Sequence, residues 1–317
     1  MRIACLLLTL SVACARPPAP APAPTSPAPA AVVIVKTPKR PSPQDEQLER
    51  GAYVVSIAGC KVCHTPMAEA DTEVGNGPRP FAGGLEGRLP QGGIWRTPNI
   101  TPDRQTGIGT WTDGQIVRAI RMGIHADGTK LLPLMPYPYY HRMTDSDALA
   151  VVAYLRSQRP IYNKVERSTG IALAPVELPP PTGNVDPVDD MVLHGEYLAT
   201  LAHCGACHTP MTGDHAGELF AGGVAFELPD GRTIFSANIT SDPDSGIGSW
   251  TESQLVDTLR TMRTPHGTPI EGPMVSYQNG WSQMSERDAH ALAAYVKSVA
   301  PVRHDVEEPP PAVTIAP

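Results

Sequence analysis

The feature that most constrains this chain is a five-residue motif that occurs twice, as Cys60-Lys-Val-Cys63-His64 and as Cys204-Gly-Ala-Cys207-His208. Each copy follows a Gly and a Tyr at the same spacing, which are Gly51 and Tyr53, and Gly195 and Tyr197. Chance is a poor explanation for a motif that recurs within a longer repeated sequence. The chain therefore consists largely of two copies of one structural unit.

The motif C-x-x-C-H is typical of covalent attachment of a c-type haem. The two thiols form thioethers with the haem vinyl groups, and the histidine that follows becomes an axial ligand of the iron. We predict two haem c groups, attached through Cys60 and Cys63 and through Cys204 and Cys207, with His64 and His208 as iron ligands. The alternatives, a redox disulfide or a zinc site, are disfavoured by the histidine after each motif.

The second axial ligand separates electron carriers from haem enzymes, and thioether sulfur is the usual one in electron-transfer cytochromes. Three methionine pairs recur in the two repeats. Met67 and Met211 lie only three residues after the motif histidines, too near to reach the opposite face of the iron. Met143 and Met284 immediately precede the last helix of each repeat, a place where an apolar side chain more often packs against the helix end.

Met135 and Met274 remain, and both lie in proline-bearing loops that can present a side chain rigidly. We predict these two methionines as the sixth ligands. The competing interpretation is a core methionine with a histidine ligand instead. His125, His141 and His266 lie near enough in the sequence, but none has a counterpart in the other repeat.

Other polar residues recur between the motif and the last helix of each repeat. One interpretation is that they contact the haem propionates; the other is that they pack, form turns or lie in solvent. These residues are Asn99, Trp111 and Arg121 in the first repeat and Asn238, Trp250 and Arg260 in the second.

The pattern predicts a mainly α fold with long loops and few strands. Only 5% of the residues are aromatic, so a haem is expected to supply much of the apolar bulk of each core. Helices are expected over 47–58, 113–121, 145–157, 252–260 and 286–298, and a strand over 233–235. The paired glycines at 51 and 195 predict a close crossing between the first and last helices of each repeat.

The expected organisation, from the N-terminus, is a signal peptide over 1–15, a Pro/Ala-rich linker over 16–43, a haem domain over 44–160, a linker over 161–188, a second haem domain over 189–304 and a disordered tail over 305–317. The first segment has the charged start and apolar run of an export signal. Ser-Val-Ala-Cys14 resembles a lipoprotein cleavage site, so Cys14 is the candidate lipid anchor; the alternative is an ordinary signal cut near Ala15. Either predicts a periplasmic protein.

The net charge of -7, from 25 basic and 32 acidic side chains, leaves no basic excess to neutralise phosphates, so we expect no nucleic-acid partner. It favours redox partner proteins that present a basic docking face.

Two C-x-x-C-H modules with Asn-Ile-Thr-x-Asp, Gly-Ile-Gly-x-Trp and an Ala-Tyr-Leu or Ala-Tyr-Val helix resemble bacterial class I cytochrome c domains. They are most similar to cytochrome c subunits of membrane-bound alcohol and gluconate dehydrogenases, over about 47–158 and 190–299. The resemblance implies two tandem class I domains with one haem each. It also implies the ligand pairs His64 with Met135 and His208 with Met274, and electron transfer from a partner dehydrogenase towards quinone or an oxidase.

Two features depart from those subunits: a third C-x-x-C-H motif and an apolar C-terminal segment are absent from this sequence. We therefore expect a dihaem electron carrier without catalysis of its own, working between a dehydrogenase donor and a cytochrome or oxidase acceptor of the respiratory chain. The alternative is a dihaem enzyme, a peroxidase or a sulfur-compound oxidase, with one catalytic haem.

Overall fold

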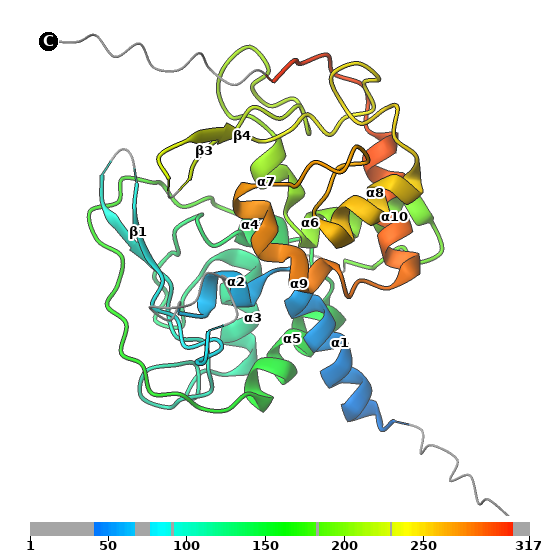
Figure 1. Ribbon diagram of the computed structural model, residues 1–317. Coiled ribbons are helices and arrows are strands. Elements are labelled where there is room, and N and C mark those ends of the chain that lie inside the picture. Colours follow the sequence, from blue (N-terminus) through cyan, green and yellow to red (C-terminus); the bar gives the residue numbers. More distant parts are fainter. Residues whose placement is uncertain (1–40, 67–76, 90–91, 182–183, 229, 307–317) are drawn as a thin grey trace, which may run out of the picture. The chain divides into compact units, whose positions relative to one another are not determined.

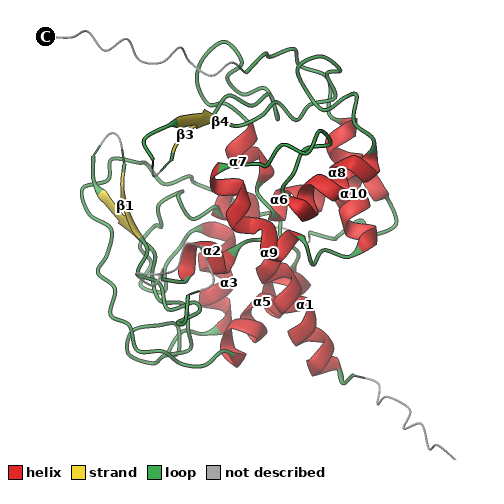
Figure 2. Cartoon of the chain, in the orientation of Figure 1, coloured by secondary structure: helices red, strands yellow, loops and turns green. Residues whose placement is uncertain are grey.

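The computed structural model describes residues 41–66, 77–89, 92–181, 184–228 and 230–306. The expected signal segment with Cys14, nearly all of the first linker, most of the tail and Met67 lie outside the described residues. Helices and loops predominate in the described part, with two short hairpins (Figures 1 and 2). None of the described helices has the length and apolar character needed to cross a membrane.

The elements follow the same order in both repeats. The first repeat contains α1 (Pro43–Ile57), α2 (Cys60–His64), β1 (Glu86–Arg88), β2 (Ile94–Arg96), α3 (Asp113–Met122), α4 (Tyr137–Tyr140) and α5 (Asp145–Ser157). The second contains α6 (Met191–Leu201), α7 (Cys204–His208), β3 (Ala225–Glu227), β4 (Thr233–Phe235), α8 (Glu252–Thr261), the 3-10 helix η1 (Gly272–Tyr277), α9 (Gln278–Trp281) and α10 (Glu286–Ser298). Each strand pair is antiparallel.

Local side-chain chemistry sets where the helices begin. Helices α3 and α8 start at matching capping boxes, in which Thr112 and Thr251 accept from the backbone of the third helical residue while that residue's glutamine accepts from the cap backbone. Helices α5 and α10 start after Thr144 and Ser285, whose side chains accept from the third helical N–H. The capping sequences before the last helix of each repeat thus act as expected.

The first and last helices of each repeat cross in close contact, as the paired glycines predicted. A Cβ atom at Gly51 in α1 would lie 2.0 Å from the carbonyl oxygen of Ala150 in α5. A Cβ atom at Gly195 in α6 would lie 1.9 Å from the carbonyl oxygen of Ala291 in α10. Only glycine lets the two backbones approach this far, which offsets its cost of about 1 kcal/mol in a helix.

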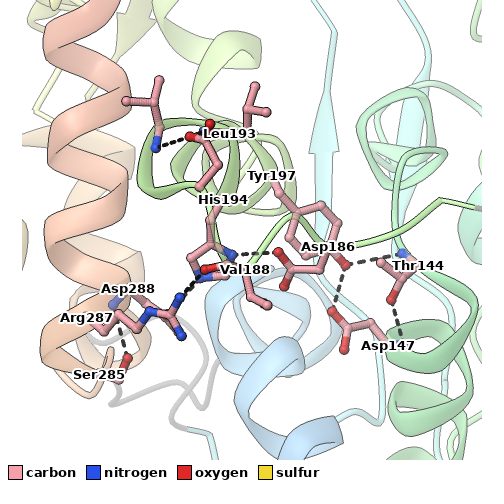
Figure 3. Close-up of polar contacts among 12 residues, drawn as sticks. Thr144, Asp147, Asp186, Val188, Leu193, His194, Tyr197, Ser285, Arg287 and Asp288 are labelled. Atoms are coloured by element: carbon pink, nitrogen blue, oxygen red, sulfur yellow. Dashed lines mark hydrogen bonds and ion pairs between the residues drawn. The ribbon is translucent and has the colours of Figure 1, made fainter.

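Reciprocal hydrogen bonds join the two repeats. The hydroxyl of Tyr53 donates to Asp288 of the second repeat, and the hydroxyl of Tyr197 donates to Asp147 of the first repeat at 2.6 Å. Each hydroxyl also accepts from the N-cap backbone of the same helix, Ser285 for Tyr53 and Thr144 for Tyr197. Figure 3 shows the Tyr197 contacts and the residues around them. The repeats are therefore bound to each other through the starts of α5 and α10.

A charged cluster lies beside these tyrosines. Arg50 donates to both carboxylate oxygens of Asp147, at 2.6 and 2.7 Å. The buried ring of His194 lies between Asp186 and Asp288, with contacts of 2.6 and 2.8 Å (Figure 3). Arg50 lies three residues before Tyr53, and His194 lies three residues before Tyr197. The two residues therefore occupy the same position in the two repeats, with an arginine in one and a histidine in the other.

The segment expected as a linker over 161–188 contacts the first repeat along its described length. Thr169 pairs through its backbone with Ile94, and the side chain of Asn163 donates to the carbonyl of Ala82 at 2.8 Å. The hydroxyl of Tyr137 accepts from the backbone of Val176 at 2.7 Å. The segment has no helix or strand among its described residues, and it is ordered by these contacts instead.

Candidate haem-attachment sites

The two C-x-x-C-H motifs form the single-turn helices α2 and α7, each entered through a residue in the left-handed region. These residues are Gly59, with φ of 66°, and His203, with φ of 43°. The left-handed residue turns the chain sharply from the end of α1 or α6 into the motif. Both motifs therefore present their two cysteines and their histidine from the same local backbone.

No disulfide joins the four motif cysteines. Burial, and then the second thiol of the motif, raise the pKa of Cys60 and of Cys204 to about 12. Redox-active C-x-x-C motifs have lowered thiol pKa values, so these cysteines have the opposite character, which disfavours the redox alternative. Within the described residues there is no cluster of three or more His, Cys, Asp and Glu that could hold a bare metal ion.

The motif histidines are oriented as iron ligands would be. Nδ1 of His64 lies 2.8 Å from the carbonyl oxygen of Pro98, and Nδ1 of His208 lies 2.8 Å from that of Ala237. A carbonyl oxygen only accepts, so Nδ1 carries the proton and Nε2 keeps its lone pair for a metal. Burial lowers the pKa of both histidines, and these hydrogen bonds oppose that shift only in part. The lowered pKa favours the neutral form of both rings.

A second recurring segment holds each motif histidine from the other side, and sequence reasoning missed it. Gly83 donates to the carbonyl of His64 at 2.7 Å, and Gly222 donates to that of His208 at 2.8 Å. Phe81 and Phe220 precede these glycines, are buried and have φ of 63° and 65°, a region that bulky residues rarely adopt. The signal was present in the sequence, since Phe-Ala-Gly-Gly occurs once in each repeat.

The predicted sixth ligands, Met135 and Met274, are partly buried and packed against the core. Met135 lies just before α4 and Met274 lies within η1. The methionines that we set aside differ: Met143 and Met284 are fully buried in the core, and Met211 is 84% exposed. Of the competing histidines, His125 packs edge-on against Trp111 and contacts Asp127, and His141 contacts the carbonyl of Arg121 through Nδ1.

Asn99 and Asn238 each organise a loop. The amide nitrogen of Asn99 donates to Thr106 and to the carbonyl of Ile161, and its oxygen accepts from the backbone and hydroxyl of Thr101. Asn238 makes the same contacts in the second repeat. The amide hydrogens therefore have protein acceptors, and contact with a propionate stays a prediction.

The two predicted arginines carry donors that the protein leaves unpaired. Arg121 is 2% exposed and binds Asp145 through Nη1, but its buried Nε and Nη2 have no partner among the described residues. Arg260 binds Glu286 at 2.8 Å, and its buried Nε likewise has no partner there. Unpaired buried donors are costly, so an anionic group such as a propionate fits both positions. Trp111 and Trp250 lie partly buried against the core.

The residues therefore fit a haem at each motif. Two cysteines outside any disulfide, a histidine with Nε2 available, a partly buried methionine and an arginine with a donor that has no partner among the described residues recur in both repeats. A bound haem would supply an iron that takes up and releases one electron. The protein's part is to fix the histidine tautomer and to bury the ligands.

The chain is similar to several known cytochrome c proteins. It is 34% identical over 281 residues to the fructose dehydrogenase cytochrome subunit of Gluconobacter japonicus, covering 83% of this chain and 55% of that protein. It is 33% identical over 287 residues to the cytochrome c subunit of the quinone-dependent alcohol dehydrogenase of Gluconacetobacter polyoxogenes, covering 83% and 58%. The chain is therefore similar to cytochrome c subunits of dehydrogenases. The resemblance predicted from the sequence is confirmed.

The chain spans little more than half the length of these two relatives. It is also 27% identical over 276 residues to a dihaem cytochrome c-type protein of Cereibacter sphaeroides, covering 80% of this chain and 86% of that protein. No family model matches the chain. The similarity supports haem c as a cofactor of this chain.

Proposed function

We propose that the protein is a dihaem c-type cytochrome that transfers electrons between a partner dehydrogenase and the respiratory chain. One observation carries the proposal: both motif histidines have Nδ1 bonded to a backbone carbonyl, so each offers Nε2 to a metal from the same backbone frame. A single motif could be incidental. Two motifs with matching support favour two working haem sites.

In this proposal, His64 with Met135 and His208 with Met274 are the axial ligands. Histidine and methionine ligation keeps the iron six-coordinate, so little rearrangement accompanies a change of oxidation state. Arg121 and Arg260 would donate to propionates, using the nitrogens that have no protein partner among the described residues. These contacts, the axial sulfur and the burial of the site are the means by which the protein sets the reduction potential.

The donor is proposed to be a dehydrogenase, because the relatives are cytochrome subunits of dehydrogenases. The cell location follows from the first 15 residues, whose charged start and apolar run support export to the periplasm. Cys14 is the proposed lipid anchor. A Cys14→Ser variant should then be released as soluble protein, and unchanged membrane association would refute the anchor.

The haem count and ligation can be tested together on the purified protein. Haem staining of a denaturing gel and a haemochrome assay should give two covalent haems per chain. The oxidised protein should show the sulfur-to-iron charge-transfer band in the red, and Met135→Ala and Met274→Ala should each remove about half of it, because each variant leaves one of two methionine ligands.

Met211→Ala is the matched control, because Met211 follows the second motif closely yet is exposed. Its band should equal that of the parent. A parent protein whose band has only half the strength expected for two methionine-ligated haems, together with peroxide turnover, would instead support the alternative of a dihaem enzyme with one open iron.

A further inference from the structure

Residues that follow the two predicted ligand methionines contact the motif region of the other repeat. Tyr139, in α4 of the first repeat, lies against Gly205 in the second motif, where a Cβ atom would be 3.3 Å from Cε1 of the tyrosine. Tyr277, the last residue of η1 in the second repeat, lies against Gly59, the residue before the first motif. A Cβ atom at Gly59 would lie 2.2 Å from Cε1 of Tyr277, so backbone and ring are in direct contact.

Tyr277 also contacts the entrance to the second motif. Its ring packs edge-to-face against His203, the residue before Cys204, with the ring centroids 5.3 Å apart. The ring therefore touches the residue before Cys60 on one side and the residue before Cys204 on the other. All four motif cysteines lie close enough to influence the ionisation of Tyr277, whereas only Cys204 and Cys207 influence that of Tyr139. Tyr277 is thus between the motifs, and Tyr139 is beside one of them.

Neighbouring aromatic residues fix this arrangement. Trp281 stacks on Tyr277 with centroids 5.1 Å apart and donates from Nε1 to the carbonyl of Ile57 at the end of α1. The hydroxyl of Tyr140 donates to the carbonyl of Ala58 at 2.7 Å, and its ring packs against His203. Aromatic packing of this kind adds about 0.5–1.5 kcal/mol per pair beyond burial. Trp281 therefore holds the ring of Tyr277 in place, and Tyr140 packs against the ring of His203.

We propose that Tyr277 and His203 couple the two haem-attachment motifs electronically, so that an electron passes between the two sites within one chain. This inference rests on the proposed dihaem function. Tunnelling weakens steeply with distance and weakens further across gaps between atoms. The contacts of Tyr277 with Gly59 and with His203 are non-bonded, but the two rings fill the space between the motifs, so the coupling is stronger with the rings than without them. The two sites then act as a relay rather than as two independent carriers.

The step is a one-electron exchange. The site that gives up the electron is oxidised by one unit and the other is reduced by one unit, so no outside reductant is consumed. No bond forms or breaks and no proton moves. Burial raises the pKa of Tyr277 well above its usual range and lowers the pKa of His203 to about 4, so both rings stay neutral.

The experiment measures electron exchange in the half-reduced holoprotein by proton NMR of the haem methyl resonances, over a range of protein concentrations. The part of the rate that does not depend on concentration is exchange within the chain. Tyr277→Leu should lower this rate at least several-fold, because the ring is lost. Tyr277→Phe keeps the ring and should exchange at nearly the parent rate.

Tyr139→Leu is the matched control, since it removes a tyrosine of the equivalent loop that lies near one motif only; its rate should stay at the parent value. His203→Gly is a second test that does not depend on the stability of Tyr277→Leu. Glycine stands at the equivalent position of the first repeat and tolerates the left-handed backbone. This variant should also exchange at least several-fold more slowly.

Parent rates in both Tyr277→Leu and His203→Gly, with two haems per chain retained, would overturn the inference and leave the proposed function intact. A rate in Tyr277→Phe as low as in Tyr277→Leu would also overturn it, because the ring would not be the coupling group. Fewer than two haems per chain in the parent protein would instead refute the proposed function, before any exchange is measured.

Discussion

The two repeats share the frame that holds each motif and differ in the residue that enters it. Gly59 enters the first motif and leaves space that the ring of Tyr277 fills. His203 enters the second motif and places its own ring against Tyr277 and Tyr140. At the same left-handed position, the first repeat has a glycine that makes room for the ring of Tyr277, and the second repeat has a histidine whose ring packs against it. The difference turns two similar units into an asymmetric pair with an aromatic contact between them.

A second difference lies at the ends of α3 and α8. Tyr137, two residues after Met135, packs against Gly123 at the end of α3, where a Cβ atom would lie 2.6 Å from its ring. The equivalent end of α8 is Met262, a buried methionine, so that position offers no glycine for a ring to pack on. Tyr277, three residues after Met274, packs on Gly59 of the other repeat.

The helix crossing is the shared feature whose loss should have the largest effect. Gly51→Ala and Gly195→Ala should each destabilise the holoprotein by about 3 kcal/mol, because the added Cβ would overlap a carbonyl oxygen of the last helix. Alanine would otherwise favour the helix, so the sign alone is informative. Denaturant unfolding of the holoprotein measures the change.

Gly114→Ala in α3 is the matched control, because nothing lies within 4 Å of a Cβ atom there. It should be neutral or stabilising by up to about 1 kcal/mol. If the two crossing variants behaved like this control, the crossing would not limit the packing of the repeats. Unequal losses at Gly51 and Gly195 would show that one repeat depends on its crossing more than the other does.

His203 should make the second repeat sensitive to acid in a way that the first is not. Burial lowers the pKa of His203 to about 4, opposed by a hydrogen bond to the Ala58 carbonyl, whereas the unfolded ring has a pKa of about 6.5. Between these values the unfolded chain binds a proton that the folded chain does not. Stability should therefore fall as the pH drops from about 6.5 to 4, by about 3 kcal/mol in all.

His203→Gly removes this group and should flatten the stability curve between pH 4 and 6.5 while leaving it little changed above pH 7. Unfolding midpoints of the parent and the variant across this range measure the effect. An unchanged slope in the variant would assign the acid sensitivity to other groups. Gly59 offers no equivalent group, so the contrast between the repeats would then disappear.

The parts of the fold that sequence reasoning recovered are those fixed by local chemistry within a repeat. The predicted bounds of the last helices, 145–157 and 286–298, match α5 and α10, because a cap precedes each helix and a basic residue, Arg156 or Lys297, lies in its last turn. The hairpins β1–β2 and β3–β4 were largely missed, since strands of three residues carry little alternation to recognise.

Contacts between the repeats could not be predicted from the sequence. Tyr53 and Tyr197 were visible as a recurring pair, but nothing in the pattern indicates that each donates to the carboxylate of the other repeat. The role of Tyr277 depends on Gly59, which is far from it in the sequence and becomes its neighbour only in the folded chain. A repeated sequence predicts that matching residues have matching roles. The proposed coupling depends instead on positions where the two repeats differ, such as Gly59 and His203.

The smallest expected effect tests whether the repeats are equivalent where their frame is the same. Thr112 and Thr251 cap α3 and α8 with the same geometry: each hydroxyl accepts from a glutamine N–H at 3.2 Å, and each backbone N–H donates to that glutamine at 2.8 Å. Thr112→Ala and Thr251→Ala should each cost about 1 kcal/mol of unfolding free energy.

Thr261→Ala, at the exposed end of α8, is the control and should be nearly neutral, because its hydroxyl only donates back to its own helix. Equal losses at the two caps would confine the asymmetry of the molecule to the positions around Tyr277. A loss at only one cap would mean that the helix ends also differ in how strongly they are coupled to the core.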